Sequence, residues 1–296
     1  MQGRVLAAYA TVSVVWGSTY LAIRIGVRHI PPALLGGIRF LTAGCVLLAV
    51  ALALGGRLPR RARDWVTAAT VGILLLSIGN GLVIWAELYV ESGTAAILVV
   101  TGALWIAVFD ALIPGSEARP TWRQFLALVI GLGGTVLLVG GIGAVEGSGV
   151  APLIALLAAA GSWALGSVYS KRRPVECGHY IHSALQMCFG GGVLLLVGAL
   201  RGEFAAWSFS LPGLGAIAYL IVFGSIVGYT SYVYLLKCAQ PALVGTTGYV
   251  NTVVAVLLGW AVLQEEVTVR TFVAMAVILG AVVWVRRAER SVRDTV

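Results

Sequence analysis

The sequence predicts an all-α polytopic membrane protein whose ten transmembrane helices form two inverted five-helix repeats. Three observations lead to this fold class. Of the 296 residues, 59% are hydrophobic and 11% are charged, whereas soluble domains carry roughly 25% charged residues. Ten apolar stretches each approach the length of about 20 residues that crosses the hydrocarbon core. Finally, the two halves of the chain align with each other at an offset of 147 residues.

The apolar stretches are continuous rather than alternating, which favours helices over a β-barrel. The loops between them are about 5–12 residues long, so we expect no soluble domain between two spans. Arg24 and the Trp-Gly-Ser-Thr core indicate that the first stretch is a retained span rather than a cleaved signal. The predicted spans are 4–23, 33–54, 65–86, 93–113, 123–140, 150–169, 181–200, 211–235, 242–263 and 269–285.

The internal alignment predicts two repeats, residues 1–141 and 149–290. Trp16 aligns with Trp163, and the T-x-R-x-F pattern that begins at Thr121 aligns with the one that begins at Thr268. Because each half has five spans, an odd number, the second half enters the membrane in the opposite orientation. Inverted repeats are typical of secondary transporters, which hold the substrate near the midplane. A duplicated helical bundle without a transport role is the alternative.

The distribution of basic residues predicts the orientation. Fifteen Lys and Arg residues fall on the side of the two termini and four fall on the other side. Cytoplasmic loops carry an excess of Lys and Arg, so we expect both termini in the cytoplasm. This bias accounts for the net charge of +8 and argues against a nucleic-acid partner. The four cysteines have neither paired nor metal-type spacing, so we expect no disulfide, metal or other cofactor.

Polar and aromatic side chains lie deep in several spans and share helix faces. In the first span, Ser13, Trp16 and Tyr20 are spaced at i, i+3 and i+7, on one face. An unpaired polar group is costly in lipid, so such faces should contact protein or a wet cavity. Close helix packing is the alternative for the small residues, and hydrogen bonding between helices is the alternative for the amides. The predicted substrate-binding residues are Trp16, Tyr20, Asn80, Thr101, Trp163, Ser167, Tyr229 and Asn251.

The charged residues within the spans also constrain the function. Arg39 and Glu87 both map to the outer third of the membrane, and we hypothesise that an ion pair between them closes an outer gate. A static pair between the second and third spans is the alternative. No carboxylate falls at a mid-span position, although a proton-driven exporter of cationic drugs would need one. No Arg or Lys falls at the midplane either, which argues against phosphate esters and favours a neutral or zwitterionic solute.

Enzymatic motifs are absent from the sequence. It contains no H-E-x-x-H, G-x-S-x-G, Walker or complete G-x-G-x-x-G pattern, so we expect no enzyme. His179 and His182 have the spacing of one helix face, but their position at the start of a span favours an interfacial pair over a metal site. A membrane enzyme or a lipid scramblase is a further alternative.

Several segments together resemble the ten-span EamA-type branch of the drug/metabolite transporter superfamily. They are WGSTY at 16–20, IRF at 38–40, GNG at 79–81, SGTAA at 92–96, FGSI at 223–226 and YVNTVVAVLLGW at 249–260. The resemblance covers essentially the whole chain. It implies a bacterial inner-membrane exporter of amino acids or related metabolites, and within the branch the aromatic-amino-acid exporters are most similar.

The chain departs from the family pattern at one position. The ninth span usually reads YVNP, and Thr252 replaces that proline here. A threonine hydroxyl can bond a backbone carbonyl and bend the helix more gently.

The residues and the resemblance together lead us to expect a monomeric exporter of neutral amino acids that works by alternating access, with lipid and a small-molecule substrate as partners. A multidrug exporter of the same fold is the alternative.

Overall fold

The computed structural model describes residues 2–90, 95, 98–112, 121–139, 150–263 and 269–293. The regular structure of these residues is entirely helical. The first half consists of α1 (Gln2–Val27), α2 (Pro32–Ala53), α3 (Ala62–Gly72), η1 (Ile73–Asn80), α4 (Gly81–Ala86), α6 (Gly102–Leu112) and α7 (Trp122–Val139). The second half consists of α8 (Val150–Arg172), α9 (His179–Leu200), η3 (Glu203–Ala206), α10 (Leu211–Tyr219), η4 (Leu220–Tyr229), α11 (Thr230–Cys238), α12 (Pro241–Gly245), α13 (Thr247–Leu263) and α14 (Val269–Arg293).

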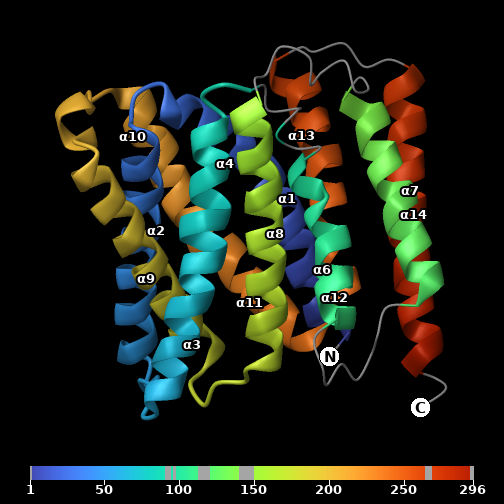
Figure 1. The fold of residues 1–296 in the computed structure, drawn as a ribbon, viewed down its shortest axis with the longest axis horizontal. Helices are drawn as coiled ribbons and strands as arrows, with labels where there is room; N and C mark the ends of the chain where they lie inside the picture. The colour runs from blue at the N-terminus through green and yellow to red at the C-terminus, as the bar shows by residue number, and fades with distance from the viewer. Residues whose placement is uncertain are drawn as a thin grey trace.

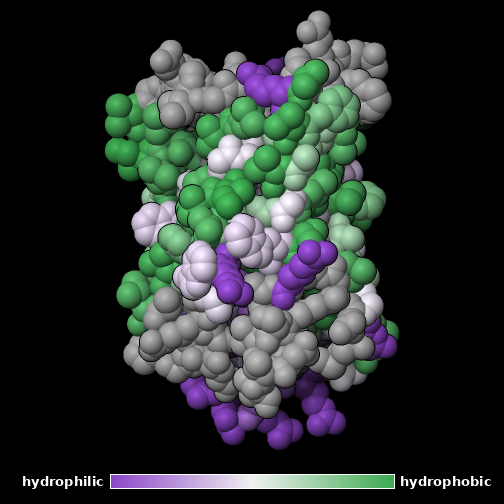
Figure 2. All heavy atoms as spheres, turned by 90° about the vertical axis from the view of Figure 1, so that its right-hand side faces the viewer, coloured by the Kyte–Doolittle hydropathy of each residue, from purple (hydrophilic) through white to green (hydrophobic). Residues whose placement is uncertain are grey.

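The helices have the length and composition of membrane spans. In the described part of the chain, six helices are long and apolar enough to cross a membrane, and three shorter apolar helices accompany them. Figure 2 shows that the face formed by α7 and α14 is mainly hydrophobic, with hydrophilic side chains gathered toward its two ends. The predicted third and eighth spans are continuous helices, and the predicted ninth span is divided into α12 and α13.

The two halves of the chain repeat the same pattern of helices. The starts of α2 and α9, of η1 and η4, and of α7 and α14 are each separated by 147 residues. This is the offset at which the two halves of the sequence align, so the predicted pair of five-helix repeats is confirmed.

The start of α1 and the end of α14 lie at the same end of the molecule, which we call the terminal face (Figure 1). The two repeats pack along α2 and α9, while α7 and α14 pack against each other at one edge. The fifth and tenth spans, α7 and α14, therefore lie at the periphery of the helical bundle.

The third and the eighth span each contain a π-helical segment, at related positions, within an otherwise α-helical span. These segments, η1 and η4, replace the α-helical bonding pattern over 8 and 10 residues. Backbone carbonyls in both segments accept hydrogen bonds from the other repeat: Ser162 donates to Leu74, and Trp16 donates to Gly224. Because π-helical segments are frequent at functional sites, their related positions in the two repeats make this region a candidate functional site.

Glycines allow α2 and α9 to approach each other closely. A Cβ atom on Gly191 would lie 2.4 Å from the backbone nitrogen of Leu41, and one on Gly44 would lie 2.8 Å from that of Cys188. Such small residues let helix backbones approach in membranes. The adjacent Gly192 is different, since a Cβ there would meet nothing within 4 Å.

This difference predicts opposite effects for two neighbouring substitutions. Gly191→Ala should lower the free energy of unfolding by about 1–3 kcal/mol, because the new methyl group forces the backbones apart. Gly192→Ala should leave it unchanged or raise it by up to about 1 kcal/mol through helix propensity. Thermal unfolding of the purified variants in detergent measures both. Equal melting temperatures for the two variants would contradict the packing described here.

Candidate functional site

A central cavity lies between the two repeats. Its volume is about 130 Å³, and its walls come from both halves of the chain, including α1, α2, η1, α8, η4 and α13. For comparison, an engineered protein cavity of about 150 Å³ binds benzene. The cavity therefore has room for one small ring or side chain at the centre of the helical bundle.

Two tryptophans related by the internal repeat meet at the wall of this cavity. The rings of Trp16 on α1 and Trp163 on α8 contact each other edge to face, with centroids 5.4 Å apart and planes at 84°. The indole nitrogen of Trp16 donates to the Gly224 carbonyl at 3.0 Å, and that of Trp163 donates to the Tyr232 hydroxyl at 2.8 Å. Both rings are thus fixed by a hydrogen bond as well as by packing.

Each of these tryptophans lies against the π-helical segment of the other repeat. A Cβ on Gly228 of η4 would lie 2.5 Å from Nε1 of Trp16, and one on Gly79 of η1 would lie 3.1 Å from Cε3 of Trp163. The glycines leave space that the indoles fill. The spacing of Gly224 and Gly228, which is also typical of close helix packing, here makes room for side chains.

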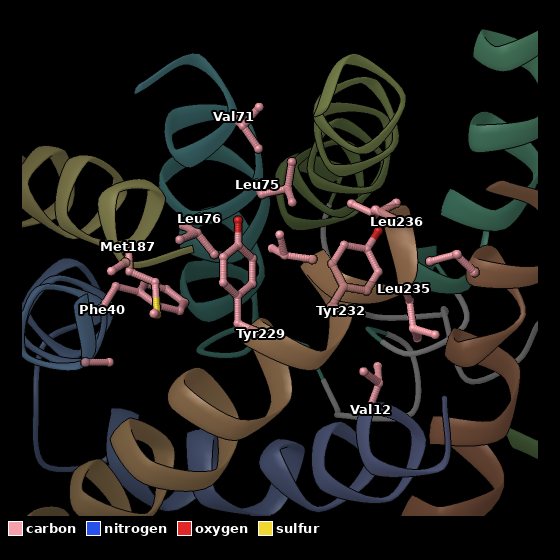
Figure 3. Packing of buried hydrophobic residues seen from close by; sticks show 14 of the residues in the cluster. Val12, Phe40, Val71, Leu75, Leu76, Met187, Tyr229, Tyr232, Leu235 and Leu236 are labelled. Atoms are coloured by element: carbon pink, nitrogen blue, oxygen red, sulfur yellow. The ribbon is translucent and has the colours of Figure 1, made fainter. Parts of the chain in front are cut away.

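Two tyrosines complete the aromatic wall. Figure 3 shows Tyr229 and Tyr232 extending from one helix into the buried apolar cluster, with Tyr229 beside Leu76 and Phe40. The Tyr232 hydroxyl hydrogen-bonds to Oγ of Ser167 at 2.7 Å and accepts from Trp163. Tyr232 shares a helix face with Tyr229 and Ser225, and this spacing could have identified it as a cavity residue.

The structure brings together most of the predicted site residues. Thr101, Ser167 and Glu87 lie outside the cavity lining. The Thr101 hydroxyl donates to the Leu98 carbonyl of its own helix at 2.5 Å, and Ser167 Oγ donates to the Trp163 carbonyl at 2.7 Å. Ser167 therefore supports Trp163 and Tyr232 from behind. The predicted residues that do line the cavity are Trp16, Tyr20, Arg39, Asn80, Trp163, Tyr229 and Asn251.

Arg39 corrects the expectation that no basic group reaches the midplane cavity. Its side chain is 3% exposed and lines the cavity, where Nε donates to Oγ of Ser225 at 2.8 Å. The guanidinium also lies 4.6 Å from the centroid of the Phe40 ring. Among the described residues, Nη1 has no hydrogen-bond partner. Helix packing rather than sequence position sets this depth, because the long side chain extends across η4.

Glu87 lies close to Arg39 without forming the hypothesised ion pair. In the described part of the chain, no nitrogen of Arg39 lies within 4.0 Å of a Glu87 oxygen. Glu87 is 9% exposed, and both of its carboxylate oxygens lack hydrogen-bond partners among the described residues. The positive charges of Arg24 and Arg39 act on it electrostatically. The pair is therefore apart in this conformation.

The ninth span connects the cavity to α1. With its amide nitrogen facing two carbonyls, Asn251 donates to Thr247 at 2.9 Å and to Ser13 at 2.8 Å. This bond joins α13 to α1, so the amide both lines the cavity and links two helices. The Thr252 hydroxyl donates to the Gly248 carbonyl at 3.1 Å, which confirms the backbone bond predicted for the residue that replaces proline.

Polar contacts tie the helices together at the terminal face. The Arg172 guanidinium on α8 pairs with the Asp110 carboxylate on α6 at 2.7 Å. Lys171 donates to the Leu236 carbonyl at 3.2 Å and also to the Ala239 carbonyl, at the end of α11. The Tyr9 hydroxyl of α1 hydrogen-bonds to Thr246 at 2.9 Å. These contacts join elements of both repeats on the terminal side of the cavity.

Gln186 is a buried residue that the sequence analysis missed. It is 0% exposed on α9, and its Oε1 accepts from the Tyr229 hydroxyl at 2.6 Å. The internal alignment could have identified it, since Gln186 aligns with Arg39 at the 147-residue offset. Both residues bond to η4, Arg39 through Ser225 and Gln186 through Tyr229.

The two repeats, the apolar spans and the central cavity define a membrane transporter. The EamA-like transporter family matches residues 3–140 and again residues 150–287. The chain belongs to this family.

Comparison with individual proteins gives the same class. The chain is 40% identical over 273 residues to the uncharacterized inner membrane transporter YedA of Escherichia coli (strain K12), covering 92% of this chain and 87% of that protein. It is 26% identical over 288 residues to the uncharacterized transporter YoaV of Bacillus subtilis (strain 168), covering 94% and 93%. A protein of known crystal structure shares the fold with a TM-score of 0.81 at 23% identity, over 99% of both chains.

Proposed function

We propose that this protein is a secondary transporter that exports aromatic and other neutral amino acids, or metabolites of similar size, across a bacterial inner membrane by alternating access. The contact between Trp16 and Trp163 in the wall of the central cavity carries this proposal. In inverted-repeat transporters the substrate is held between the repeats near the midplane. Two repeat-related aromatic rings at this position supply a binding surface to which both halves contribute.

The chemistry of the cavity suits a zwitterion with an apolar side chain. The rings of Trp16, Trp163 and Tyr229 can stack on an aromatic side chain or lie over an ammonium group, with about 0.5–2 kcal/mol for each contact. The free Nη1 of Arg39 offers a charged hydrogen bond to a carboxylate. Asn80 adds an amide to the lining. The lining thus offers groups that match both the polar and the apolar end of an amino acid.

The same lining disfavours an exporter of cationic drugs, which is the alternative for this fold. A cationic substrate calls for a carboxylate in the binding site. Glu87 and Asp110 both lie outside the cavity lining, and Asp110 is paired with Arg172. Among the described residues, the charged group that lines the cavity is the guanidinium of Arg39, which would repel a cation.

The contacts on the two sides of the cavity support an alternating-access cycle. At the terminal face, the Arg172–Asp110 ion pair holds α8 to α6. On the other side, Arg39 and Glu87 are close but unpaired. With the termini in the cytoplasm, as the excess of basic residues predicts, the contacts at the terminal face close the cytoplasmic side in this conformation. The Arg39–Glu87 ion pair then forms when the outer side closes and the contacts at the terminal face break.

Efflux from liposomes tests the proposed function. The purified protein, reconstituted with labelled Phe, Trp, Thr or Met inside, should show saturable efflux. Trp163→Ala should raise KM for Phe and Trp about 3- to 10-fold, because one aromatic contact of about 0.5–1.5 kcal/mol is lost. Trp122→Ala is the matched control, since Trp122 is 70% exposed at the start of α7.

Two results would overturn this assignment. If folded protein transports none of the four amino acids, the amino-acid proposal is wrong and the multidrug exporter becomes the favoured function. If Trp163→Ala and Trp122→Ala have equal KM values, the Trp16–Trp163 pair contributes to packing and not to substrate binding.

Kinetics of Glu87 variants test the gate. Glu87→Gln should lower kcat about tenfold, equivalent to about 1.4 kcal/mol, because closure loses its ion pair. The KM should stay unchanged, since Glu87 lies outside the cavity. Glu87→Asp should restore part of the rate, and Glu176→Gln, an exposed carboxylate paired with Arg61 at the terminal face, is the control. A raised KM with unchanged kcat would place Glu87 in the binding site instead.

A further inference from the structure

A chain of buried polar side chains leads from the cavity toward the terminal face. The Tyr229 hydroxyl donates to Oε1 of Gln186 at 2.6 Å, and Nε2 of Gln186 lies 2.5 Å from Nε2 of His182. Gln186 is 0% exposed and His182 is 4% exposed. His182 lies one turn into α9, behind the exposed residues of the α8–α9 loop. The chain thus joins a cavity residue to the edge of the bundle.

The surroundings of this chain are apolar. Tyr229 belongs to the buried cluster that includes Leu76 and Met187, and Ile181 and Leu185 on α9 belong to another. Burying an imidazole among such residues is expensive, and an ionisable residue at membrane depth is by default a candidate functional site. Among the described residues, Nδ1 of His182 also has no hydrogen-bond partner. A purely structural bond to Gln186 does not require a group that can take up a proton.

The directions of the hydrogen bonds depend on the charge of His182. Gln186 accepts from Tyr229 through its oxygen, so it presents its amide nitrogen to His182. Nε2 of His182 must then be the acceptor, and the neutral ring carries its hydrogen on Nδ1. In this arrangement the hydroxyl hydrogen of Tyr229 points to Gln186 and is not offered to the cavity.

We propose that His182 is the proton-binding site of this transporter, and that Gln186 links its protonation to Tyr229 in the cavity. A proton that binds Nε2 turns this atom into a donor, so it can no longer accept from the Gln186 amide. Rotation of the amide presents its oxygen to His182 and its nitrogen to the oxygen of Tyr229. The Tyr229 hydroxyl hydrogen then points into the cavity, where it disfavours the ammonium group of the solute, so the proton and the solute bind alternately. One N–H bond forms at His182 and no other covalent bond changes.

The charges around His182 connect its protonation to helix movement. In the described part of the chain, the charged groups that act on it are Lys237 on α11 and Asp64 on α3. Lys237 carries a positive charge and Asp64 a negative one, so movement of either helix changes the electrostatic field at His182. The other packed elements, α2 and η1, contribute no charge at this depth. A shift of α11 relative to α9 during alternating access changes the distance to Lys237, so the proton is bound in one conformation and released in the other.

This inference rests on the proposed function, because it assigns the coupling ion of the same transport cycle. With one proton moved per solute, a pH difference of about one unit supports about a tenfold concentration ratio of solute. His182 would then be a binding residue for the coupling proton, whereas Gln186 is a positioning residue.

The experiment follows solute and protons together. Proteoliposomes hold a pH-sensitive dye and labelled phenylalanine, and both signals are recorded with and without a pH difference of about one unit. For the wild type we expect phenylalanine flux accompanied by proton flux in the opposite direction. His182→Gln and Gln186→Leu should each lower the number of protons moved per phenylalanine by at least about 90%. Ser183→Ala is the matched control, since Ser183 is a buried neighbour on α9 whose hydroxyl has no partner among the described residues.

The possible outcomes are separable. Phenylalanine flux without proton flux in the wild type would overturn the proton site and leave the proposed function standing. Proton coupling that survives in both variants would also overturn it, as would its loss in Ser183→Ala. The absence of any phenylalanine flux in the wild type would overturn the proposed function and the proton site together.

Discussion

The edge-to-face contact between Trp16 and Trp163 is the interaction on which the rest of the site depends. It joins the first helix of one repeat to the first helix of the other at the wall of the central cavity. Each indole lies against the π-helical segment of the opposite repeat, where a glycine leaves space for it. The two repeats are therefore interlocked at one point rather than merely side by side. Movement of one repeat against the other has to be accommodated around this pair.

The membrane environment explains why this interlock uses π-helical segments. In a bilayer every backbone polar group must find a partner within the protein. The π-helical pattern allows backbone carbonyls to accept from side chains, and Leu74 and Gly224 accept from Ser162 and Trp16 of the other repeat. The segments thus provide polar anchors between the repeats without exposing unpaired groups to lipid. They also change the hydrogen-bonding pattern of the third and eighth spans at points where these helices would have to bend if the repeats rock against each other.

Much of this architecture could be predicted from the sequence because the membrane restricts it so strongly. The apolar stretches define the spans, and the alignment of Trp16 with Trp163 indicated a contact that involves both repeats. The depth and direction of individual side chains could not be predicted in the same way. Arg39 reaches the cavity because its guanidinium extends across η4, and Thr101 is turned away because its hydroxyl bonds a carbonyl of its own helix. The π-helical segments leave no mark in composition or periodicity.

The polar network shows where sequence reasoning needs three-dimensional partners. Gln186 appears in the sequence as an amide within an apolar span, and its role emerges only from its contacts with Tyr229 on η4 and His182 one turn away on α9. A pair of histidines at the start of a span is commonly interfacial, and His179 is indeed partly exposed there. His182 differs because α9 turns it toward α3 and α11, away from the surface.

The most direct measurement of this account is the distance between α1 and α8 at the terminal face. Spin labels at Arg4→Cys and Arg173→Cys, both exposed positions, report this distance in a variant whose four native cysteines are serine. The account predicts two distance populations in lipid bilayers. Phenylalanine should shift their ratio, because the contacts at the terminal face break and form during transport. A single distance that phenylalanine leaves unchanged, in protein that still transports it, would contradict alternating access about the Trp16–Trp163 contact.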